Sequence, residues 1–257
     1  MNSELEGDIR HITTLRTYDR HSPSGCNLFA ASQAMFVAER FLGRKQPVGA
    51  PAHRGAAVED GVTHGLKDLK APLKECYDAA FETYDARMAL SGDPRRDHYR
   101  GTIPDMVEAA LVELREYGTP TEFQGRVEWK PEGLEYPVMG YFDYRWINHG
   151  IVADLKTTER MPSQIKISHA RQVALYAVDD STDARLIYVT PKKLEPYRLE
   201  NISEHKKALY NIAKRIENFK ALSDDPNFFV SITVPDLESF YWATPQARQM
   251  AWEIWGI

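Results

Sequence analysis

Two aspartates and one lysine lie close together in a segment whose pattern predicts a β-hairpin. The hairpin turns at Asn148-His149-Gly150, a strong turn signal between two runs of aromatic and β-branched residues. With the turn centred on its first two residues, Asp143 faces Asp154 across the two strands, and a bulge at the glycine would shift this register. Lys156 is two residues beyond Asp154 and therefore on the same face of the strand. The sequence thus predicts two carboxylates and an ammonium side by side.

This set of side chains suits the hydrolysis of a phosphodiester. Two carboxylates about 4.5–5.5 Å apart repel each other unless a cation lies between them. Oxygen ligands suit Mg²⁺, which keeps several waters for a substrate phosphate, and the carbonyl of Leu155 offers a further oxygen. Lys156 adds a fixed positive charge that orients a water or stabilises a phosphorane-like transition state.

An acid and a lysine two residues apart are a weak signal, but three neighbouring features add to it. Thr157 and Thr158 end the strand with hydroxyl groups, and Gln172 and Tyr176 share one face of an expected helix. An earlier helix contains Arg54, Gly55 and Glu59. Because helical side chains lean toward the N-terminus, the missing side chain at Gly55 is expected to leave room for a metal or phosphate beside Glu59.

These pieces occur in a fixed order along the chain. They are Arg54-Gly55-x-x-x-Glu59, Gly140-x-x-Asp143, Asp154-Leu155-Lys156-Thr157 and Gln172-x-x-x-Tyr176. Together they resemble the motifs of the PD-(D/E)XK nuclease superfamily, in particular its RecB-type and lambda-exonuclease-like (YqaJ-like) branch. Phe142 stands where the motif name suggests proline, and Glu59 stands where some members have histidine.

The resemblance implies a role for each of these residues. Asp143, Asp154 and the Leu155 carbonyl would hold Mg²⁺, with Mn²⁺ as the alternative, and Glu59 would contribute directly or through water. Lys156 would be the catalytic lysine. Gln172, Tyr176, Thr157 and Arg54 would support the site or contact DNA, and His64 is an alternative ligand.

The resemblance also implies a fold and a function. The fold would be α/β, a restriction-endonuclease-like mixed central β-sheet flanked by helices, with a helical N-terminal third. The function would be a Mg²⁺-dependent DNA exonuclease acting in recombination, repair or the degradation of DNA, and phage origin stays open. Two alternatives stay open as well: a structure-specific or restriction-type endonuclease, and a non-catalytic DNA-binding recombination module. The partner would be DNA, as a duplex end or a single strand, and a homo-oligomer or a recombination-protein partner stays open.

The expected elements follow from hydrophobic periodicity and from turn residues. Helices are expected from a cap at Ser24 to Gly43, over 53–69, 72–89, 104–118 and 168–178, from a cap at Ser203 to about 220, and over 245–255 with Trp252 and Trp255 on an apolar surface. Strands are expected over 123–130, 135–146, 151–156 and 184–189. We expect a single nuclease domain over 1–257, helical to about 120, with a catalytic sheet core over 121–220 and a C-terminal extension over 221–257.

Composition sets limits on the protein's class. Of 257 residues, 43% are hydrophobic and 27% charged, which supplies a packed core and excludes a disordered scaffold. The net charge of −5 excludes a uniformly basic nucleic-acid coat protein. Basic residues nevertheless outnumber acidic ones between 161 and 220, where Lys192, Lys193, Lys207 and Lys214 are candidate contacts to a phosphate backbone.

Other classes lack their sequence signals. No apolar run approaches the roughly 20 residues needed to cross a bilayer, and the N-terminus has no secretion signal, so a cytoplasmic location (the host cytoplasm for a viral protein) is expected. With only Cys26 and Cys76, neither a disulfide framework nor an iron–sulfur cluster with four cysteines of this chain is expected. There is no glycine-rich cradle, so no nucleotide cofactor is expected.

Overall fold

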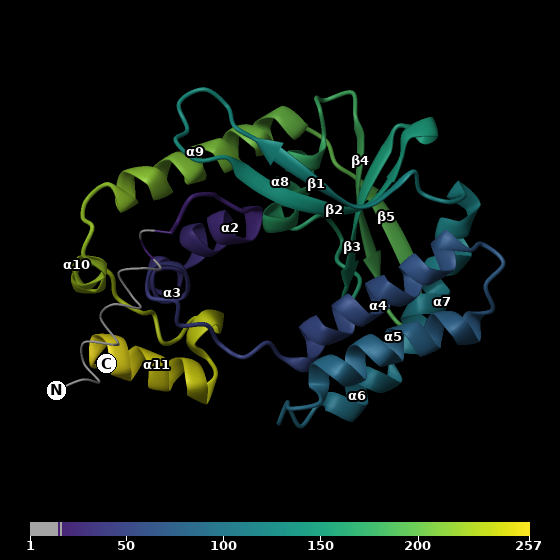
Figure 1. Ribbon diagram of the computed structural model, residues 1–257, viewed down its shortest axis with the longest axis horizontal. Helices are drawn as coiled ribbons and strands as arrows, with labels where there is room; N and C mark the ends of the chain where they lie inside the picture. The colour runs from purple at the N-terminus through teal and green to yellow at the C-terminus, as the bar shows by residue number, and fades with distance from the viewer. Residues whose placement is uncertain (1–14, 16) are drawn as a thin grey trace. The chain divides into compact units, whose positions relative to one another are not determined.

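The computed structural model describes Leu15 and residues 17–257, which pack as two compact units (Figure 1). Unit 1 comprises Met1–Pro47, Glu128–Met139 and Lys206–Ile257, and unit 2 comprises Val48–Val127 and Gly140–His205. Each unit combines stretches that are distant in sequence, so boundaries near 120 and 220 do not coincide with either unit. That residues 1–257 form a single nuclease domain stays a prediction.

Four helices in the N-terminal part of unit 2 form a layer built around α4. They are α4 (Ala50–Lys67), α5 (Leu73–Met88), α6 (Arg96–Gly101) and α7 (Ile103–Leu114). Val58, Val62 and Leu66 are fully buried on one face of α4, which packs against α5 and α7. This face is the stripe that the periodicity predicts, except that Leu69 lies beyond the helix and is exposed.

The sheet has five strands in the order β1-β2-β3-β4-β5. They are β1 (Glu122–Trp129), β2 (Val138–Trp146), β3 (Ile151–Thr157), β4 (Asp183–Val189) and β5 (Leu194–Arg198). β2 pairs with β3 antiparallel, β3 with β4 parallel, and β4 with β5 antiparallel, so the sheet is mixed. The predicted α/β class, with a mixed sheet and a mostly helical N-terminal part, is confirmed.

The hairpin of β2 and β3 has the predicted register. Tyr144 pairs with Ala153 and Trp146 with Ile151. A 3₁₀ turn over Ile147–His149 leads into Gly150, whose φ of 65° lies in the left-handed region that glycine adopts without strain. The turn reverses the chain direction without a bulge, so the pairing of β2 with β3 keeps the predicted register.

Two elements of unit 2 complete the sheet layer. α8 (Ile167–Tyr176) packs against β3 and β4. β5, which the sequence reading missed, is the last strand in the sheet order and carries Pro196 opposite Ile187. Proline has no N–H to donate to a neighbouring strand. It is tolerated in an edge strand because one side of such a strand has no neighbour.

Unit 1 is largely helical. Its helices are α2 (Pro23–Ala31), α3 (Gln33–Phe36), a π-helical turn over Val37–Phe41, most of α9 (Ile202–Lys220), α10 (Pro226–Ile232) and α11 (Pro245–Trp255). The predicted cap at Ser24 is wrong, because the Ser22 side chain accepts the Gly25 N–H and Pro23 begins the helix. Ser203 does not cap α9 either: it lies in the first turn and donates to Asp180.

An aromatic cluster fills the core of unit 1. Phe36, Phe41 and Phe229 are fully buried, and the rings of Phe41 and Phe229 lie 4.8 Å apart between centroids. Phe219 of α9 stacks on Phe41 at 6.1 Å. These ring contacts join α9 and α10 to the π-helical turn near the N-terminus.

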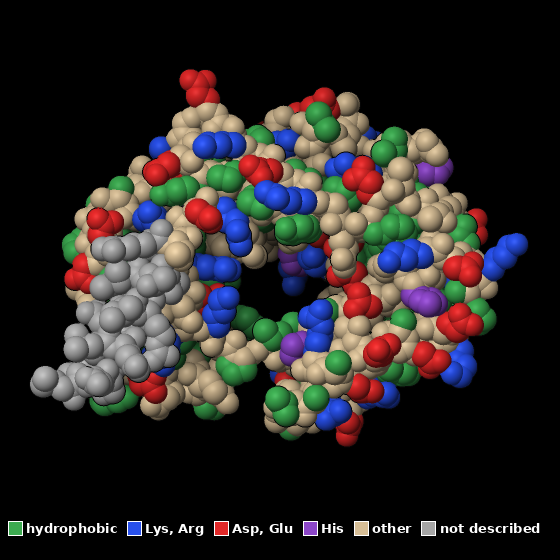
Figure 2. Space-filling model, in the orientation of Figure 1, with side chains coloured by type: hydrophobic (Ala, Val, Ile, Leu, Met, Phe, Trp, Pro, Cys, Tyr) green, Lys and Arg blue, Asp and Glu red, His purple; other side chains and the backbone are tan. Residues whose placement is uncertain are grey.

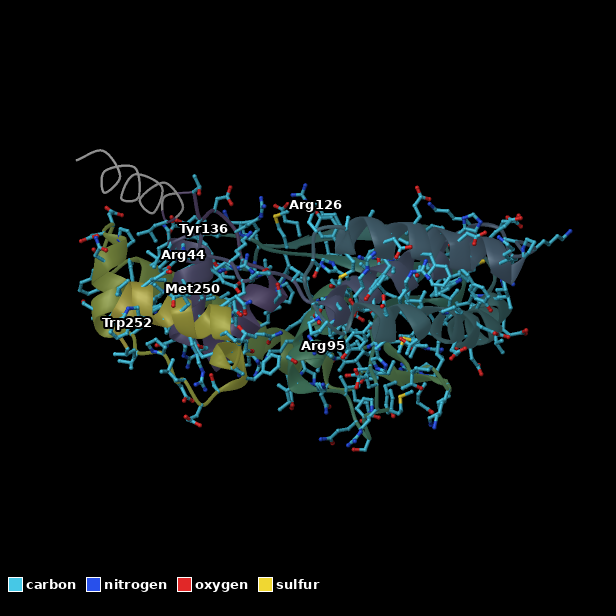
Figure 3. The ribbon with its side chains drawn as sticks, turned by 90° about the horizontal axis from the view of Figure 1, so that it is seen from below. Arg44, Arg95, Arg126, Tyr136, Met250 and Trp252 are labelled. Carbon is cyan, nitrogen blue, oxygen red and sulfur yellow. The ribbon has the colours of Figure 1, made fainter. Side chains whose placement is uncertain are left out.

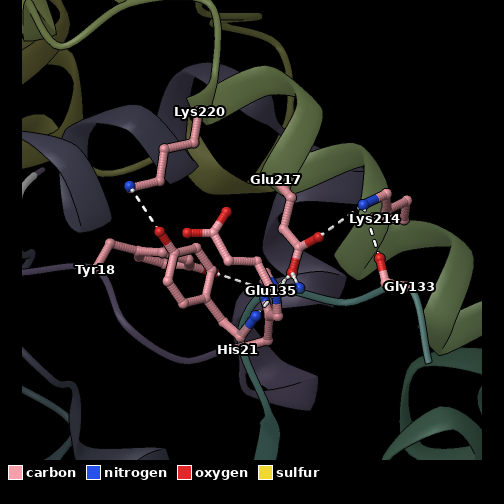
Figure 4. Close-up of polar contacts among 8 residues, drawn as sticks. Tyr18, His21, Gly133, Glu135, Lys214, Glu217 and Lys220 are labelled. Atoms are coloured by element: carbon pink, nitrogen blue, oxygen red, sulfur yellow. Dashed lines mark hydrogen bonds and ion pairs between the residues drawn. The ribbon is translucent and has the colours of Figure 1, made fainter. Parts of the chain in front are cut away.

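A buried polar network lies beside this cluster (Figure 4). Glu217 of α9 accepts hydrogen bonds from the backbone N–H groups of Glu135 and Tyr136, with N···O distances of 2.7 and 3.0 Å. Its carboxylate also contacts His21 Nε2 and the Lys214 ammonium, each at 3.2 Å. One carboxylate thereby attaches α9 to the segment that precedes β2.

The C-terminal helix α11 differs from the expectation. Trp252 is 64% exposed and points away from the helix into solvent (Figure 3), so the prediction that it lies on an apolar surface is wrong. Trp255 does pack as predicted, with its ring 5.6 Å from that of Trp242. None of the helices in the described part of the chain has the length and apolar character needed to cross a membrane.

Candidate active site

Asp143 and Asp154 lie on adjacent strands of unit 2. The register that pairs Tyr144 with Ala153 places them opposite each other on β2 and β3. The N–H of Leu155 donates to Asp143 Oδ2 over 2.6 Å, so the Asp143 carboxylate turns toward β3. Asp154 is only 1% exposed, whereas Asp143 is half-buried. The hairpin thus holds two carboxylates together at the middle of the sheet.

Lys156 is the cation of this cluster. Its ammonium forms an ion pair with Asp154 Oδ2. Burial opposes the charged form of Lys156, but the nearby Asp154, Asp143 and Glu59 carboxylates outweigh it and raise its pKa. The lysine side chain is 28% exposed as a whole, and its ammonium is held by Asp154.

Glu59 of α4 is the third carboxylate of the cluster. Burial raises its pKa, against a hydrogen bond from Gln124 and the charge of Lys156. Burial, followed by the neighbouring Asp154 and Glu59, raises the pKa of Asp143 well above its usual value. Burial also raises the pKa of Asp154, although Lys156 opposes this. Three carboxylates share one ammonium, so the cluster holds protons tightly and favours a further cation.

Gln124 of β1 is a site residue that the sequence reading missed. Its Nε2 donates to Glu59 Oε1 over 2.9 Å. Its backbone has a φ of 49°, a left-handed conformation that is costly for a residue other than glycine. An extended run of strand residues carries no sign of such a conformation, so only the structure identifies it.

Gln172 and Tyr176 lie one turn apart on α8 and form a hydrogen-bonded chain that ends at Asp154. Gln172 Nε2 lies 3.1 Å from Asp154 Oδ1 and 2.9 Å from the Tyr176 hydroxyl. Burial and the nearby Asp154 raise the pKa of Tyr176. The structure therefore places both residues of the expected pair at the site, with Gln172 in direct contact with an aspartate.

Gly55 brings α4 against the end of β3. A Cβ atom at this position would lie 3.3 Å from Thr157 Oγ1, closer than a side chain normally packs. The space that was expected to receive a metal or phosphate at Gly55 is therefore occupied by the Thr157 hydroxyl. Arg54, the preceding residue, is 3% exposed, and its guanidinium lies over the ring of Tyr99.

The histidines lie in different surroundings. His64 is on α4 but contacts Glu75 of α5 at 3.8 Å, so the structure does not bring it to the carboxylate cluster. His169 of α8 is half-buried, and its Nδ1 lies 2.8 Å from the Tyr188 hydroxyl. Burial, with the nearby Lys156 and Lys166, lowers its pKa to about 4. His169 thus stays neutral near the site.

Two of the four candidate backbone-contact lysines, Lys193 and Lys214, have side-chain partners within the protein. Lys193 pairs with Glu195 at 3.2 Å, and Lys214 donates to the Gly133 carbonyl over 2.7 Å. Over the helices α4 to α6 in Figure 2, basic and acidic side chains are interspersed. The face in view shows no continuous basic patch on those helices, so attraction to a nucleic acid would be local.

The side chains of the cluster fit a hard divalent cation by their chemistry. Carboxylate and carbonyl oxygens are the ligands of Mg²⁺, which takes one or two carboxylates and retains waters. In the described residues, no three His, Cys, Asp or Glu side chains are already arranged to hold a metal ion. In this structure Lys156 pairs with Asp154 Oδ2, and Asp143 Oδ2 accepts from the backbone N–H of Leu155. A cation would bind by taking the place of these contacts.

Comparison with known proteins adds little to this geometry. No family model matches the sequence, and no curated protein matches it. Among solved structures, the crystal structure of SSO0001 is similar with a TM-score of 0.34 and 18% identity, over 74% of this chain and 96% of that one. A similarity at this score carries no argument about fold or function.

Proposed function

We propose that this protein is a Mg²⁺-dependent DNA exonuclease of the PD-(D/E)XK superfamily, in its RecB-type and lambda-exonuclease-like branch, with a restriction-endonuclease-like fold. One observation carries the proposal. Asp143 and Asp154 meet across β2 and β3, and the ammonium of Lys156 lies on the Asp154 carboxylate. Two acids that can hold a metal ion and a lysine on the same sheet face suit the hydrolysis of a phosphodiester.

Each residue of the cluster would have a separate role in the reaction. Asp143, Asp154 and the Leu155 carbonyl would hold Mg²⁺, with Glu59 directly or through water. When bound, the ion supplies Lewis-acid polarisation of the phosphate and lowers the pKa of its water. Lys156, displaced from Asp154 Oδ2, is then free to stabilise negative charge on the reacting phosphate.

The neighbouring residues keep this arrangement in place. Gln172 holds Asp154 Oδ1 and leaves Oδ2 to Lys156 or a cation. Gln124 fixes one oxygen of Glu59. Glu59 is half-buried and the Lys156 side chain is 28% exposed, so neither is fully enclosed by the protein.

The first test is digestion of end-labelled linear DNA with Mg²⁺. Lys156→Ala removes the only ammonium of the cluster and Asp154→Asn removes a ligand charge, so each should lower the cleavage rate by roughly 100-fold or more. Lys74→Ala changes an exposed lysine of α5 that forms an ion pair with Asp78, and it should cleave like the unchanged protein. Full activity of Lys156→Ala and Asp154→Asn, with folding intact, would refute the proposal.

A closed circular DNA separates exonuclease from endonuclease. An exonuclease requires an end, so circular single-stranded and duplex DNA should resist digestion while the linear forms disappear. Cleavage of the circles would assign the same residues to an endonuclease. Mg²⁺-dependent binding without cleavage of either form would indicate the non-catalytic module.

A further inference from the structure

His169 lies beside Lys156 on one face of the sheet. It is in the first turn of α8, and its Nδ1 lies 2.8 Å from the hydroxyl of Tyr188. Tyr188 pairs with Lys156 across β3 and β4, so the two side chains share a face. One turn further along α8, Gln172 contacts Asp154, which precedes Lys156 by two residues on that face. α8 therefore places His169 level with the lysine and Gln172 level with the aspartate.

The hydroxyl of Tyr188 determines which ring nitrogen of His169 carries the hydrogen. Tyr188 is 1% exposed, and its oxygen accepts the backbone N–H of Lys166 over 3.3 Å. Its own hydrogen is enclosed, and among the described residues His169 Nδ1 is the acceptor that it meets. A neutral imidazole has one acceptor nitrogen and one donor nitrogen. Nδ1 therefore accepts from Tyr188, and Nε2 carries the hydrogen.

The Nε2–H group of His169 has no partner within the described residues. It is not enclosed either, because the buried unpartnered atoms in this part of the chain lie on other residues. The ring itself is held against Tyr188, with the two centroids 5.7 Å apart and the planes tilted by 40°. The structure thus presents an oriented donor that no described group uses.

The surroundings of this donor favour an anion. The charges of Lys156 and Lys166 reach His169, and together with burial they lower its pKa to about 4, so the ring itself is uncharged at neutral pH. The first turn of α8 contains no acidic residue, so the positive end of the helix dipole is not neutralised there. A neutral N–H beside an ammonium and a helix N-terminus suits a phosphate oxygen.

We propose that His169 is a further catalytic residue, whose Nε2–H donates to a non-bridging oxygen of the phosphate that Lys156 faces. The hydrogen bond stabilises the negative charge that builds up on this oxygen as water attacks, and no proton is transferred. The proposal rests on the proposed function for its ligand, a phosphodiester of DNA. It adds a second donor to the single ammonium of the cluster.

Two substitutions of His169 separate a catalytic role from a structural one. In His169→Asn, the amide oxygen reaches the place of Nδ1 and accepts from Tyr188, but the Nε2–H is lost. In His169→Gln, an amide N–H reaches the place of Nε2, while the contact with Tyr188 is lost. We expect kcat of His169→Asn to fall about 10- to 100-fold with KM changed less than about threefold, and His169→Gln to recover part of this loss.

The order of the two variants decides between the roles. If His169 only holds α8 on β4, His169→Asn keeps the required contact and should be at least as active as His169→Gln. That order would overturn the proposal.

Sulfur substitution tests the contact with the phosphate atom. Each non-bridging oxygen of the terminal linkage is replaced in turn by sulfur, which gives two diastereomers of a linear DNA. Sulfur is the weaker acceptor, so the unchanged protein should cleave one diastereomer more slowly because of His169. In His169→Asn the oxygen-to-sulfur rate ratio of that diastereomer should shrink about threefold or more, and the other ratio should stay constant. Ratios that are unchanged for both diastereomers would overturn the proposal.

His98→Asn is the matched control. It makes the same exchange at an exposed histidine of α6, which also belongs to unit 2. It should cleave the oxygen and sulfur substrates like the unchanged protein. A loss as large as that of His169→Asn would show that the effect is not specific to His169 and would overturn the proposal.

Nitrogen NMR of protein labelled with ¹⁵N-histidine supplies a readout that does not need cleavage. A short oligothymidylate is added with Ca²⁺ in place of Mg²⁺, because Ca²⁺ binds oxygen ligands at longer distances and in a less regular geometry. The His169 signals, assigned by their loss in His169→Asn, should show a neutral ring protonated at Nε2, and the Nε2 signal should shift on addition of the oligonucleotide. A ring protonated at Nδ1, or an Nε2 signal that does not respond, would overturn the proposal.

The two proposals fail in different ways. A protein that does not cut DNA with Mg²⁺, but whose His169 Nε2 signal responds to the oligonucleotide, contradicts the nuclease function and leaves the phosphate contact standing. A protein that cuts DNA, and whose His169→Asn variant has unchanged kcat, contradicts only the role of His169.

Discussion

At the scale of single residues, Gln124 combines a functional contact with an unfavourable backbone. Its amide holds Glu59, whereas its φ of 49° costs roughly 1–2 kcal/mol in a residue with a Cβ atom. Such a conformation persists when the surrounding structure enforces it, and it is common at active sites. The backbone conformation of Gln124 therefore lowers the stability of the fold, whereas its side chain supports the candidate active site.

Gln124→Gly tests this opposition. Removing the Cβ relieves the strained backbone, so the melting temperature should rise or stay constant. Removing the amide frees Glu59, so Mg²⁺-dependent cleavage should fall about 3- to 30-fold. Gln124→Asn, which tolerates the left-handed region but has a shorter reach, should show the same loss of activity. A glycine variant that is less stable and fully active would contradict this account of Gln124.

At the scale of elements, one carboxylate attaches α9 to the segment before β2. Glu217 accepts two backbone N–H groups and contacts His21 and Lys214. Glu217→Ala leaves these groups without their acceptor and should lower the free energy of unfolding by about 3–5 kcal/mol. Urea denaturation measures this loss. Glu204→Ala, at an exposed acid of the same helix, should change it by about 0.5 kcal/mol or less, and equal stability of the two variants would contradict the assigned role.

The elements also show how far sequence reasoning reached. The hairpin register followed from the turn residues, because pairing around a short turn fixes every later pair along the two strands. β5, α6 and α10 were missed because each has only five to seven residues, too few for a hydrophobic period to be detected. The contact between His169 and Tyr188 depends on how α8 packs on β4, which is set by tertiary packing.

At the scale of the whole molecule, the carboxylate cluster couples the fold to cations and protons. The pKa values of Asp143, Asp154 and Glu59 are raised in the folded state, which therefore binds protons more tightly than the unfolded chain. The corresponding stability is present below the ordinary carboxyl pKa and is lost as the pH rises through the raised values. His21 and His169, whose pKa values are lowered by burial, have the opposite effect on stability in the same pH range. The contribution of the carboxylates is therefore measured as the difference in melting temperature between the unchanged protein and Asp143→Asn, and this difference should change as the pH is raised from about 5 to about 8.

Mg²⁺ should reverse this loss. A cation that binds only the folded protein stabilises it by about 2.7 kcal/mol at 100 times its dissociation constant. Because the ion replaces protons, the increase in melting temperature should be larger near pH 8 than near pH 5. In Asp143→Asn, one of the repelling charges is gone, so both the pH dependence and the Mg²⁺ effect should shrink. An equal Mg²⁺ effect in this variant would exclude Asp143 as a ligand.

The proline in the last strand of the sheet has a consequence for self-association. Exposed strand edges act as templates on which a second chain can add its own strand, the first step toward domain swapping and fibrils. Pro196 removes one donor from that edge, and the charged Glu195 and Arg198 flank it. Copies of this protein that assemble, for instance into a ring, would therefore not continue the sheet past β5.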